Sequence, residues 1–108
     1  MSNQFRIVRE NTANGGALIV TVDKRDGRGK MTFTDVTAKQ RSVDHTEVDE
    51  SLGGTGAGKA LATRMVELAR EDGVYLIPIC PFFRATAKKH PEWHDIVQMP
   101  KETKAGAN

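Results

Sequence analysis

VDESLGGTGAGKAL, residues 48–61, is the stretch that decides how this chain folds. Four glycines lie between Gly53 and Gly58, and a helical pattern begins directly after them. Glycine tolerates positive φ and lets backbone N–H groups approach a ligand closely. The N-terminus of a helix adds unpaired N–H donors and a partial positive charge. The segment therefore indicates a cradle for a phosphate or pyrophosphate, with a flexible loop before a helix as the plainer interpretation.

Four short strands are expected before this loop. Apolar, alternating or β-branched runs place them at residues 5–10, 17–22, 31–36 and 42–48. Their connections are too short for a crossover helix, so we expect an antiparallel meander. Strict alternation along the fourth strand would put Val43, His45 and Glu47 on one face.

A β-α-β unit is expected after the glycines. Leu61, Met65, Leu68 and Ala69 recur at the spacing of one buried helical face between about residues 58 and 72. The apolar run 74–80 then predicts a strand parallel to the fourth one. Pro78 cannot donate to a strand ladder, so it marks an edge, a bulge or a place where strands part.

A second helix is expected at residues 82–90, closed by Pro91. The sequence thus predicts an α/β (α+β) fold with a mixed sheet, in which an antiparallel meander continues into a parallel β-α-β unit, and two helices. We expect one domain over residues 1–100 and a disordered tail over 101–108.

Composition narrows the function classes. The net charge of +2, without a long basic run, gives no support to nucleic-acid binding. Cys80 is the single cysteine, which excludes an internal disulfide and a cysteine-based metal cluster. Neither a secretory signal nor an apolar run of the ~20 residues that cross a bilayer is present, so we expect a cytoplasmic protein without membrane partners.

A Mg²⁺-nucleotide loop is the first alternative for the glycines. Gly53, Gly58 and Lys59 fit the GxxxxGK pattern, but Ala60 stands where a Ser or Thr hydroxyl should bind the metal. The later apolar strand ends in Cys80 and Pro81 rather than in a carboxylate. We therefore reject this interpretation and expect no metal.

The order of elements and the glycine loop together resemble the GNAT superfamily of N-acetyltransferases. Its signature, Gln/Arg-x-x-Gly-x-Gly/Ala, is matched by residues 53–58 except at Gly53. Three segments further resemble the very small, single-domain members: residues 45–48, residues 52–58, and residues 78–82 followed by His90-Pro91-Glu92. The resemblance covers about residues 42–97, and the joint spacing of three motifs is more specific than the glycines alone.

The resemblance implies acetyl-CoA binding. The pyrophosphate would lie on backbone N–H groups at the start of the helix, and the pantetheine arm in a wedge between the fourth and fifth strands. The cofactor-binding residues so expected are Val48, Gly53, Gly54, Thr55, Gly56, Ala57, Gly58, Lys59, Arg84 and Lys88. Gly53 lacks the side chain that often contacts phosphate at this position, so more of the binding is left to backbone amides.

Glu47, His45 and Cys80 are the catalytic candidates, and each has a structural alternative. Glu47 could act as a general base if burial raised its pKa, or could be an exposed strand residue. His45 could titrate near neutrality beside it, or be a hydrogen-bonded structural histidine. Cys80 could carry the acetyl group, line the pantetheine tunnel, or be a small buried hydrophobe.

Two function hypotheses follow. The first is an acyltransferase that moves acetyl from acetyl-CoA to an unknown amine. Residues 11–16 leave no room for helices that would shape an acceptor pocket, so the site would be open and would suit a protein or peptide amine. The second is a non-catalytic CoA-binding or interaction module with the same fold.

Overall fold

The computed structural model describes residues 4–99. Its elements follow the chain in the order β1 (Phe5–Thr12), β2 (Gly15–Val22), β3 (Gly29–Thr37), β4 (Gln40–Val48), α1 (Ala57–Asp72), β5 (Tyr75–Pro78) and α2 (Pro81–Lys88). Short 3-10 turns lie at Glu50–Leu52 and Pro91–Trp93. The strands form one sheet in the order β1-β2-β3-β4-β5, antiparallel throughout except for the parallel pair β4 and β5. The mixed α+β fold expected from the sequence is thereby confirmed.

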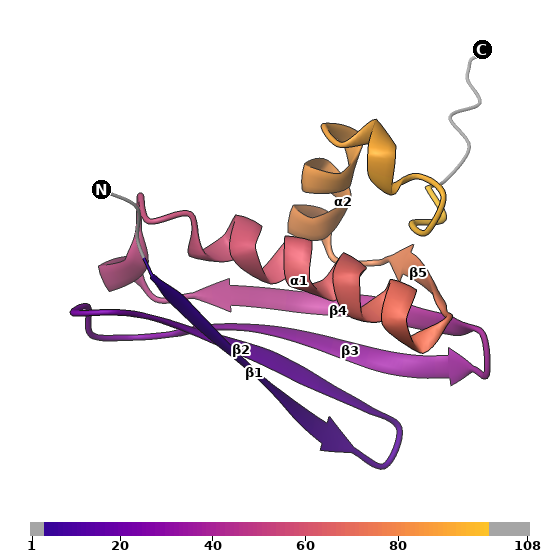
Figure 1. The fold of residues 1–108 in the computed structure, drawn as a ribbon, viewed down its shortest axis with the longest axis horizontal. Helices are drawn as coiled ribbons and strands as arrows, with labels where there is room; N and C mark the ends of the chain where they lie inside the picture. Colours follow the sequence, from indigo (N-terminus) through magenta and orange to yellow (C-terminus); the bar gives the residue numbers. More distant parts are fainter. Residues whose placement is uncertain (1–3, 100–108) are drawn as a thin grey trace.

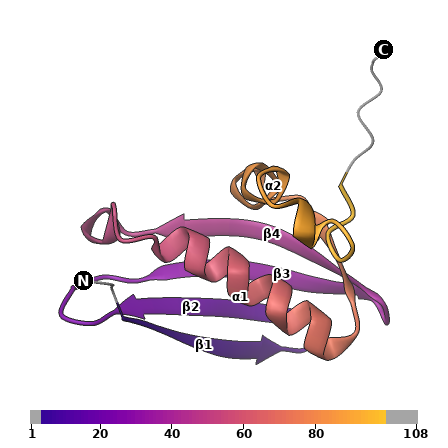
Figure 2. The same cartoon turned by 45° about the horizontal axis from the view of Figure 1, so that its top comes forward.

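Both helices lie on the same face of the sheet (Figures 1 and 2). α1 crosses the sheet diagonally, and α2 lies beside it, at the side of the sheet that contains β4. The apolar face expected for α1 is the face that it buries, with Leu61, Met65 and Ala69 fully covered. Gly73 ends the helix at φ 71°, the left-handed conformation that a glycine adopts without strain.

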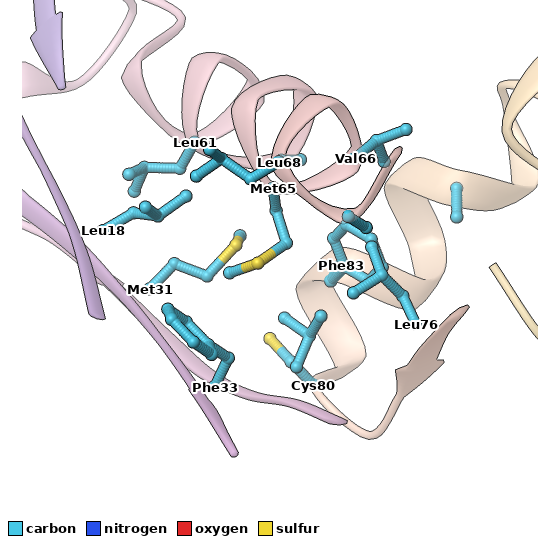
Figure 3. Packing of buried hydrophobic residues seen from close by; sticks show 14 of the residues in the cluster. Leu18, Met31, Phe33, Leu61, Met65, Val66, Leu68, Leu76, Cys80 and Phe83 are labelled. Atoms are coloured by element: carbon cyan, nitrogen blue, oxygen red, sulfur yellow. The ribbon is translucent and has the colours of Figure 1, made fainter. Parts of the chain in front are cut away.

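The hydrophobic core fills the space between the sheet and the two helices (Figure 3). Leu18, Met31 and Phe33 point up from the sheet toward Met65 of α1, and Phe83 of α2 closes the cluster. Phe83 and Ala87 of α2 are buried, whereas Phe82 is exposed by 42%.

β5 is shorter than the predicted strand and forms an edge of the sheet. Its pairing with β4 runs from Gln40–Tyr75 to Val43–Pro78, and the backbone N–H of Cys80 donates a last hydrogen bond to the carbonyl of Val43 at 2.8 Å. Beyond this point the chain leaves the sheet and enters α2. Pro78 therefore stands where the two strands part, which is one of the roles expected for it.

The expected alternation along β4 is wrong at one point. Thr32 pairs with His45 and Phe33 pairs with Val43, so Asp44 is an extra residue in β4. Such a bulge bends the strand and shifts its alternation by one position. Val43 is fully buried under the helices, whereas His45 and Glu47 are exposed on the opposite, uncovered face of the sheet.

The predicted tail, residues 101–108, lies outside the described residues. Within residues 4–99, neither helix is long and apolar enough to span a bilayer.

Candidate active site

The glycine loop has the backbone geometry that its sequence suggests. Gly54 and Gly56 have φ values of 78° and 87°, which side-chain-bearing residues rarely adopt. Gly53 has φ −58°, a value open to any residue. Buried Leu52 anchors the loop, and the Thr55 hydroxyl donates to its carbonyl at 2.6 Å and accepts from the Ala57 N–H at 3.2 Å. The amides of Gly58 and Lys59, in the first turn of α1, have no acceptor inside the helix, as at the start of any helix.

The hairpin loop between β2 and β3 makes hydrogen bonds to the residues that precede the glycine loop. The Ser51 hydroxyl donates to the Asp26 carbonyl at 2.8 Å, and the Arg25 guanidinium donates to the Ser51 carbonyl at 3.0 Å. Asp49 accepts a hydrogen bond from the Arg28 N–H at 2.8 Å. The charged segment 24–30 thus helps to hold the glycine loop in place.

A cleft of about 510 Å³ opens between the glycine loop, the start of α1 and one side of α2. Its lining consists of Val48, Leu52, Gly53, Gly54, Gly56, Ala57, Gly58, Lys59, Phe82, Thr86, Lys89 and His90. Most of the predicted cofactor-binding residues therefore gather around one hollow. Buried Thr55 contributes to the loop through its hydrogen bonds and is not part of the lining.

Gly58 lets Phe82 of α2 pack closely against the start of α1. A Cβ atom added at Gly58 would lie 2.8 Å from the Cζ atom of Phe82, closer than packed carbon atoms approach each other. Because Gly58 has an ordinary helical backbone, its glycine serves close packing between α1 and α2 rather than a positive φ. The tip of the Phe82 ring can therefore contact the backbone of α1 at one wall of the cleft.

The basic groups at the cleft are Lys59 from α1 and Lys89 from the end of α2. Arg84 and Lys88, expected here from the sequence, are absent from the lining. Arg84 instead donates to the carbonyls of Pro78 at 3.2 Å and Ile79 at 3.4 Å. The helical period explains the difference, because positions 82, 86 and 89 share one face of α2 and positions 84 and 88 do not. Once Phe82 is assigned to the cleft, this spacing identifies Thr86 and Lys89 as its neighbours.

The cleft reaches the end of β4, beyond the point where β4 and β5 part. Val48, at the end of β4, lines it. The Asp49 N–H donates to the Arg28 carbonyl across the β3 side at 3.0 Å. Since backbone groups alternate in direction along an antiparallel ladder, the N–H and C=O of Val48 point away from β3. A backbone donor and acceptor are thus available at the free side of β4.

Cys80 lies at the same junction but inside the core. Its side chain is 2% exposed among core residues that include Phe33 and Phe83 (Figure 3). Its Sγ atom lies 3.2 Å from the Oγ1 atom of Thr46, and it is not part of the cleft lining. The geometry matches the interpretation of Cys80 as a small buried hydrophobe better than that of an exposed nucleophile.

His45 and Glu47 lie on the other side of the sheet from the cleft. Their shared face is confirmed: Nε2 of His45 lies 3.4 Å from Oε2 of Glu47. The side chains are 65% and 76% exposed, because the bulge at Asp44 turns both away from the helices. Glu47 therefore lacks the burial on which its expected role as a base depended.

His90 is a cleft residue without an assigned role in the sequence reasoning. Its ring stacks on Trp93 with centroids 4.2 Å apart, and its Nδ1 lies 2.9 Å from Oε2 of Glu92. The hydrogen bond with His90 lowers the pKa of the Glu92 carboxyl. The fixed ring leaves Nε2 as the nitrogen open to other partners. The sequence signal for His90 is the segment His90-Pro91-Glu92, which is part of the resemblance to the small GNAT proteins.

In residues 4–99, no three His, Cys, Asp or Glu side chains gather in a way that could hold a metal ion.

The comparisons with known proteins agree with this geometry. The family model of the GCN5-related N-acetyl-transferases matches residues 18–96. No curated protein matches the chain significantly. Among solved structures, the chain is similar to a GCN5-like candidate N-acetyltransferase from Staphylococcus aureus, with 24% identity and a TM-score of 0.65. The match covers 92% of this chain and 95% of that one, and at this identity it supports the fold alone. Since the family model spans most of the sequence, the chain belongs to the GCN5-related N-acetyltransferase family.

Proposed function

We propose that this protein binds acetyl-CoA and transfers its acetyl group to an amine. The observation that carries the proposal is one continuous cleft, which joins the glycine loop and first turn of α1 to the free side of β4. That cleft combines an anion cradle at one end with an extended backbone edge at the other. The two ends suit the pyrophosphate and the amide-bearing pantetheine arm of CoA.

The residues present fit the cofactor. Gly53, Gly54 and Gly56 have no side chains that could block access to the backbone amides that follow. The amides of Gly58 and Lys59 are the natural donors to a pyrophosphate, since the Ala57 amide already bonds to Thr55. The ammonium groups of Lys59 and Lys89 add positive charge on two sides of the cleft.

The free backbone of Val48 is the proposed partner of the pantetheine amides. The parting of β4 and β5 after Val43 removes the strand that would otherwise occupy this edge. Phe82 and Leu52 supply apolar walls. When bound there, acetyl-CoA would supply an acetyl group activated as a thioester.

We propose that the amine approaches the thioester from the uncovered face of the sheet, through the gap where β4 and β5 part, and that His45 and Glu47 act on it there. An incoming amine must lose a proton before it can attack, and the imidazole of His45 is a group that can accept that proton. Glu47, 3.4 Å away, can orient that imidazole. For Cys80 we propose a packing role at the strand junction, because its thiol is covered by core side chains and by Thr46.

The acceptor is proposed to be a protein or peptide amine. β1 and β2 are joined at Thr12 and Gly15 by a two-residue turn, so no helix is inserted there to enclose the acceptor side. An open face can accommodate a large substrate but holds a small one through few contacts.

Isothermal titration of the protein with acetyl-CoA tests the proposal. The expected result is binding with one-to-one stoichiometry. No binding at millimolar acetyl-CoA would contradict the proposal as a whole. A second assay incubates the complex with lysine peptides and free amines and detects the released CoA thiol. Binding without thiol release for any amine would contradict transfer and would identify a CoA-binding module.

A further inference from the structure

β1 is a free edge of the sheet. It is the outermost strand, and among residues 4–99 it pairs only with β2 (Figure 2). Val8 and Phe5 are 50% and 38% exposed on it. Natural proteins usually protect such edges with proline, bulges, short strands or charged side chains. Phe5–Thr12 has eight residues, no proline and no bulge in its pairing with β2. Its charged side chains are of both signs, so the edge remains open to a strand of complementary charge.

The hydrogen-bonding register shows which backbone groups are available. The Asp23 N–H donates to the Gln4 carbonyl at 2.9 Å, which makes Gln4 and Asp23 a hydrogen-bonded pair. Because the direction alternates along an antiparallel ladder, Arg6, Val8 and Glu10 also bond toward β2. The N–H and C=O groups of Phe5, Ile7, Arg9 and Asn11 consequently point outward.

The side chains on the uncovered face form a symmetric charge pattern. Arg6, Val8 and Glu10 lie opposite Thr21, Ile19 and Ala17 of β2, on the face without helices. On this face Val8 lies between a cation, Arg6, and an anion, Glu10. A rotation of 180° about Val8 therefore places the position of Arg6 on that of Glu10, and the reverse.

We propose that β1 pairs with β1 of a second copy, antiparallel, around a two-fold axis at Val8. In this register Arg6 lies opposite Glu10 of the second copy, and Glu10 lies opposite Arg6 of the second copy. Every outward-facing backbone group from Phe5 to Asn11 then finds a partner. The two sheets join into one continuous sheet, and the helices of both copies lie on its other face.

The other symmetric registers are worse. Centring the pair on Arg6 or on Glu10 places like charges directly opposite each other, and centring it on Arg9 does the same. Centring it on Ile7 places Arg6 opposite Val8 and forms no pair of opposite charges. Opposite charges directly across two strands stabilise the pair and like charges destabilise it. The sequence of β1 therefore selects one register.

A second copy fits this edge better than an unrelated peptide does. A peptide strand would need to carry the reversed pattern, whereas a copy of the chain carries it automatically. One pair of strands buries little surface, so we expect a reversible dimer that forms over about 10 µM to 1 mM. The dimer does not depend on acetyl-CoA, and its test is independent of the proposed transferase activity.

Sedimentation velocity at low ionic strength tests the register through charge exchange. Arg6→Glu should weaken dimerisation at least about tenfold, because it replaces two attractive pairs with two repulsive ones. The double variant Arg6→Glu/Glu10→Arg should restore it. Both side chains are exposed, and circular dichroism checks that each variant is folded. A wild-type protein that stays monomeric to about 1 mM, or single and double variants that dimerise equally, would overturn the proposal.

Cysteine cross-linking tests the axis directly. Residues facing each other in a non-hydrogen-bonded pair lie about 4.5 Å apart between Cα atoms, which permits a disulfide. Val8→Cys should therefore form a covalent dimer under mild oxidation. Thr21→Cys, on the same face but one strand further from the axis, is the matched control and should cross-link at least about tenfold more slowly. Equal rates for the two variants would indicate random collision and would overturn the proposed axis.

Discussion

The Sγ atom of Cys80 lies 3.2 Å from the Oγ1 atom of Thr46, across the point where β4 and β5 part. This contact joins the two strands through side chains just beyond their last backbone hydrogen bond. A thiol held in this way is a packing group with a weak hydrogen bond.

Cys80→Ala should therefore leave most of the proposed activity in place. We expect less than a tenfold fall in the rate of CoA release and a loss of about 1–2 kcal/mol in the free energy of unfolding, since a small buried group is removed. Intact mass spectrometry after incubation with acetyl-CoA should detect no acetylated protein. An adduct that forms in the wild type and disappears in Cys80→Ala would assign the nucleophile to Cys80 instead.

Gly58→Val should close the cleft. The new side chain would meet the ring of Phe82, so the ring must move into the space proposed for CoA. We expect at least a tenfold loss of acetyl-CoA affinity by calorimetry, about 1.4 kcal/mol or more. Combining it with Phe82→Ala removes the clash, and this double variant should recover part of the affinity. Unchanged affinity in Gly58→Val would mean that CoA binds elsewhere.

Gly53→Arg should strengthen acetyl-CoA binding. The backbone of Gly53 at φ −58° and ψ 138° is open to any residue, and the position lines the cleft. A guanidinium there could donate charge-assisted hydrogen bonds to the pyrophosphate, so affinity should rise about tenfold. Gly53→Glu is the control of opposite charge and should weaken binding. Equal affinities for the two variants would place the phosphates away from Gly53.

Glu47→Gln should slow transfer without weakening cofactor binding. The residue faces the uncovered side of the sheet, opposite the helices and the cleft. Loss of a group that supports the general base should reduce turnover about 100-fold, while the Kd for acetyl-CoA stays unchanged. Lys30→Gln is a suitable control, because Lys30 lies directly opposite Glu47 on β3. A similar loss in both variants would indicate a general disturbance of this face of the sheet rather than loss of the group that supports the base.

Asp72 links the end of α1 to the sheet and should make stability depend on pH. Burial acts to raise the pKa of its carboxyl, but hydrogen bonds from Arg9 at 2.9 Å and Arg41 at 3.0 Å outweigh it and lower that pKa. A lowered folded-state pKa gives stability that is complete above the unfolded value of about 3.9 and is lost as pH falls through the folded value.

Asp72→Asn should consequently cost about 1–2 kcal/mol at pH 7, because Arg41 is buried and loses a charged partner. Urea unfolding at pH 7 and pH 3 measures the effect, and the gap between wild type and variant should narrow at pH 3. Asp95→Asn is the exposed control, since Asp95 pairs with Arg70 at the surface. A gap that widens at low pH would contradict this account of Asp72.

The parts of the fold that the sequence predicts are those governed by periodicity. The spacing of Leu61 and Met65 predicts the buried face of α1, and Gly73 marks its end. The parallel pairing of β5 with β4 follows from the helix that connects the two strands. The bulge at Asp44 has no recognisable sequence pattern. The sequence could therefore predict that His45 and Glu47 share a face, but not which face of the sheet it is. The cleft side of α2 also needed the structure, because only contact with Gly58 shows which way Phe82 faces.

The bulge makes the length of β4 a determinant of binding. Asp44 is held by the hydroxyls of Thr34 and Ser42, both at 2.6 Å, and the pairing of β4 with β5 stops at Val43, immediately before it. Deletion of Asp44 would leave the cross-strand partners of Val43 and His45 unchanged and would remove only the kink. A straighter β4 would diverge less from the chain that leaves β5, and the wedge proposed for pantetheine would narrow. The width of that wedge would thus depend on one residue inserted in β4.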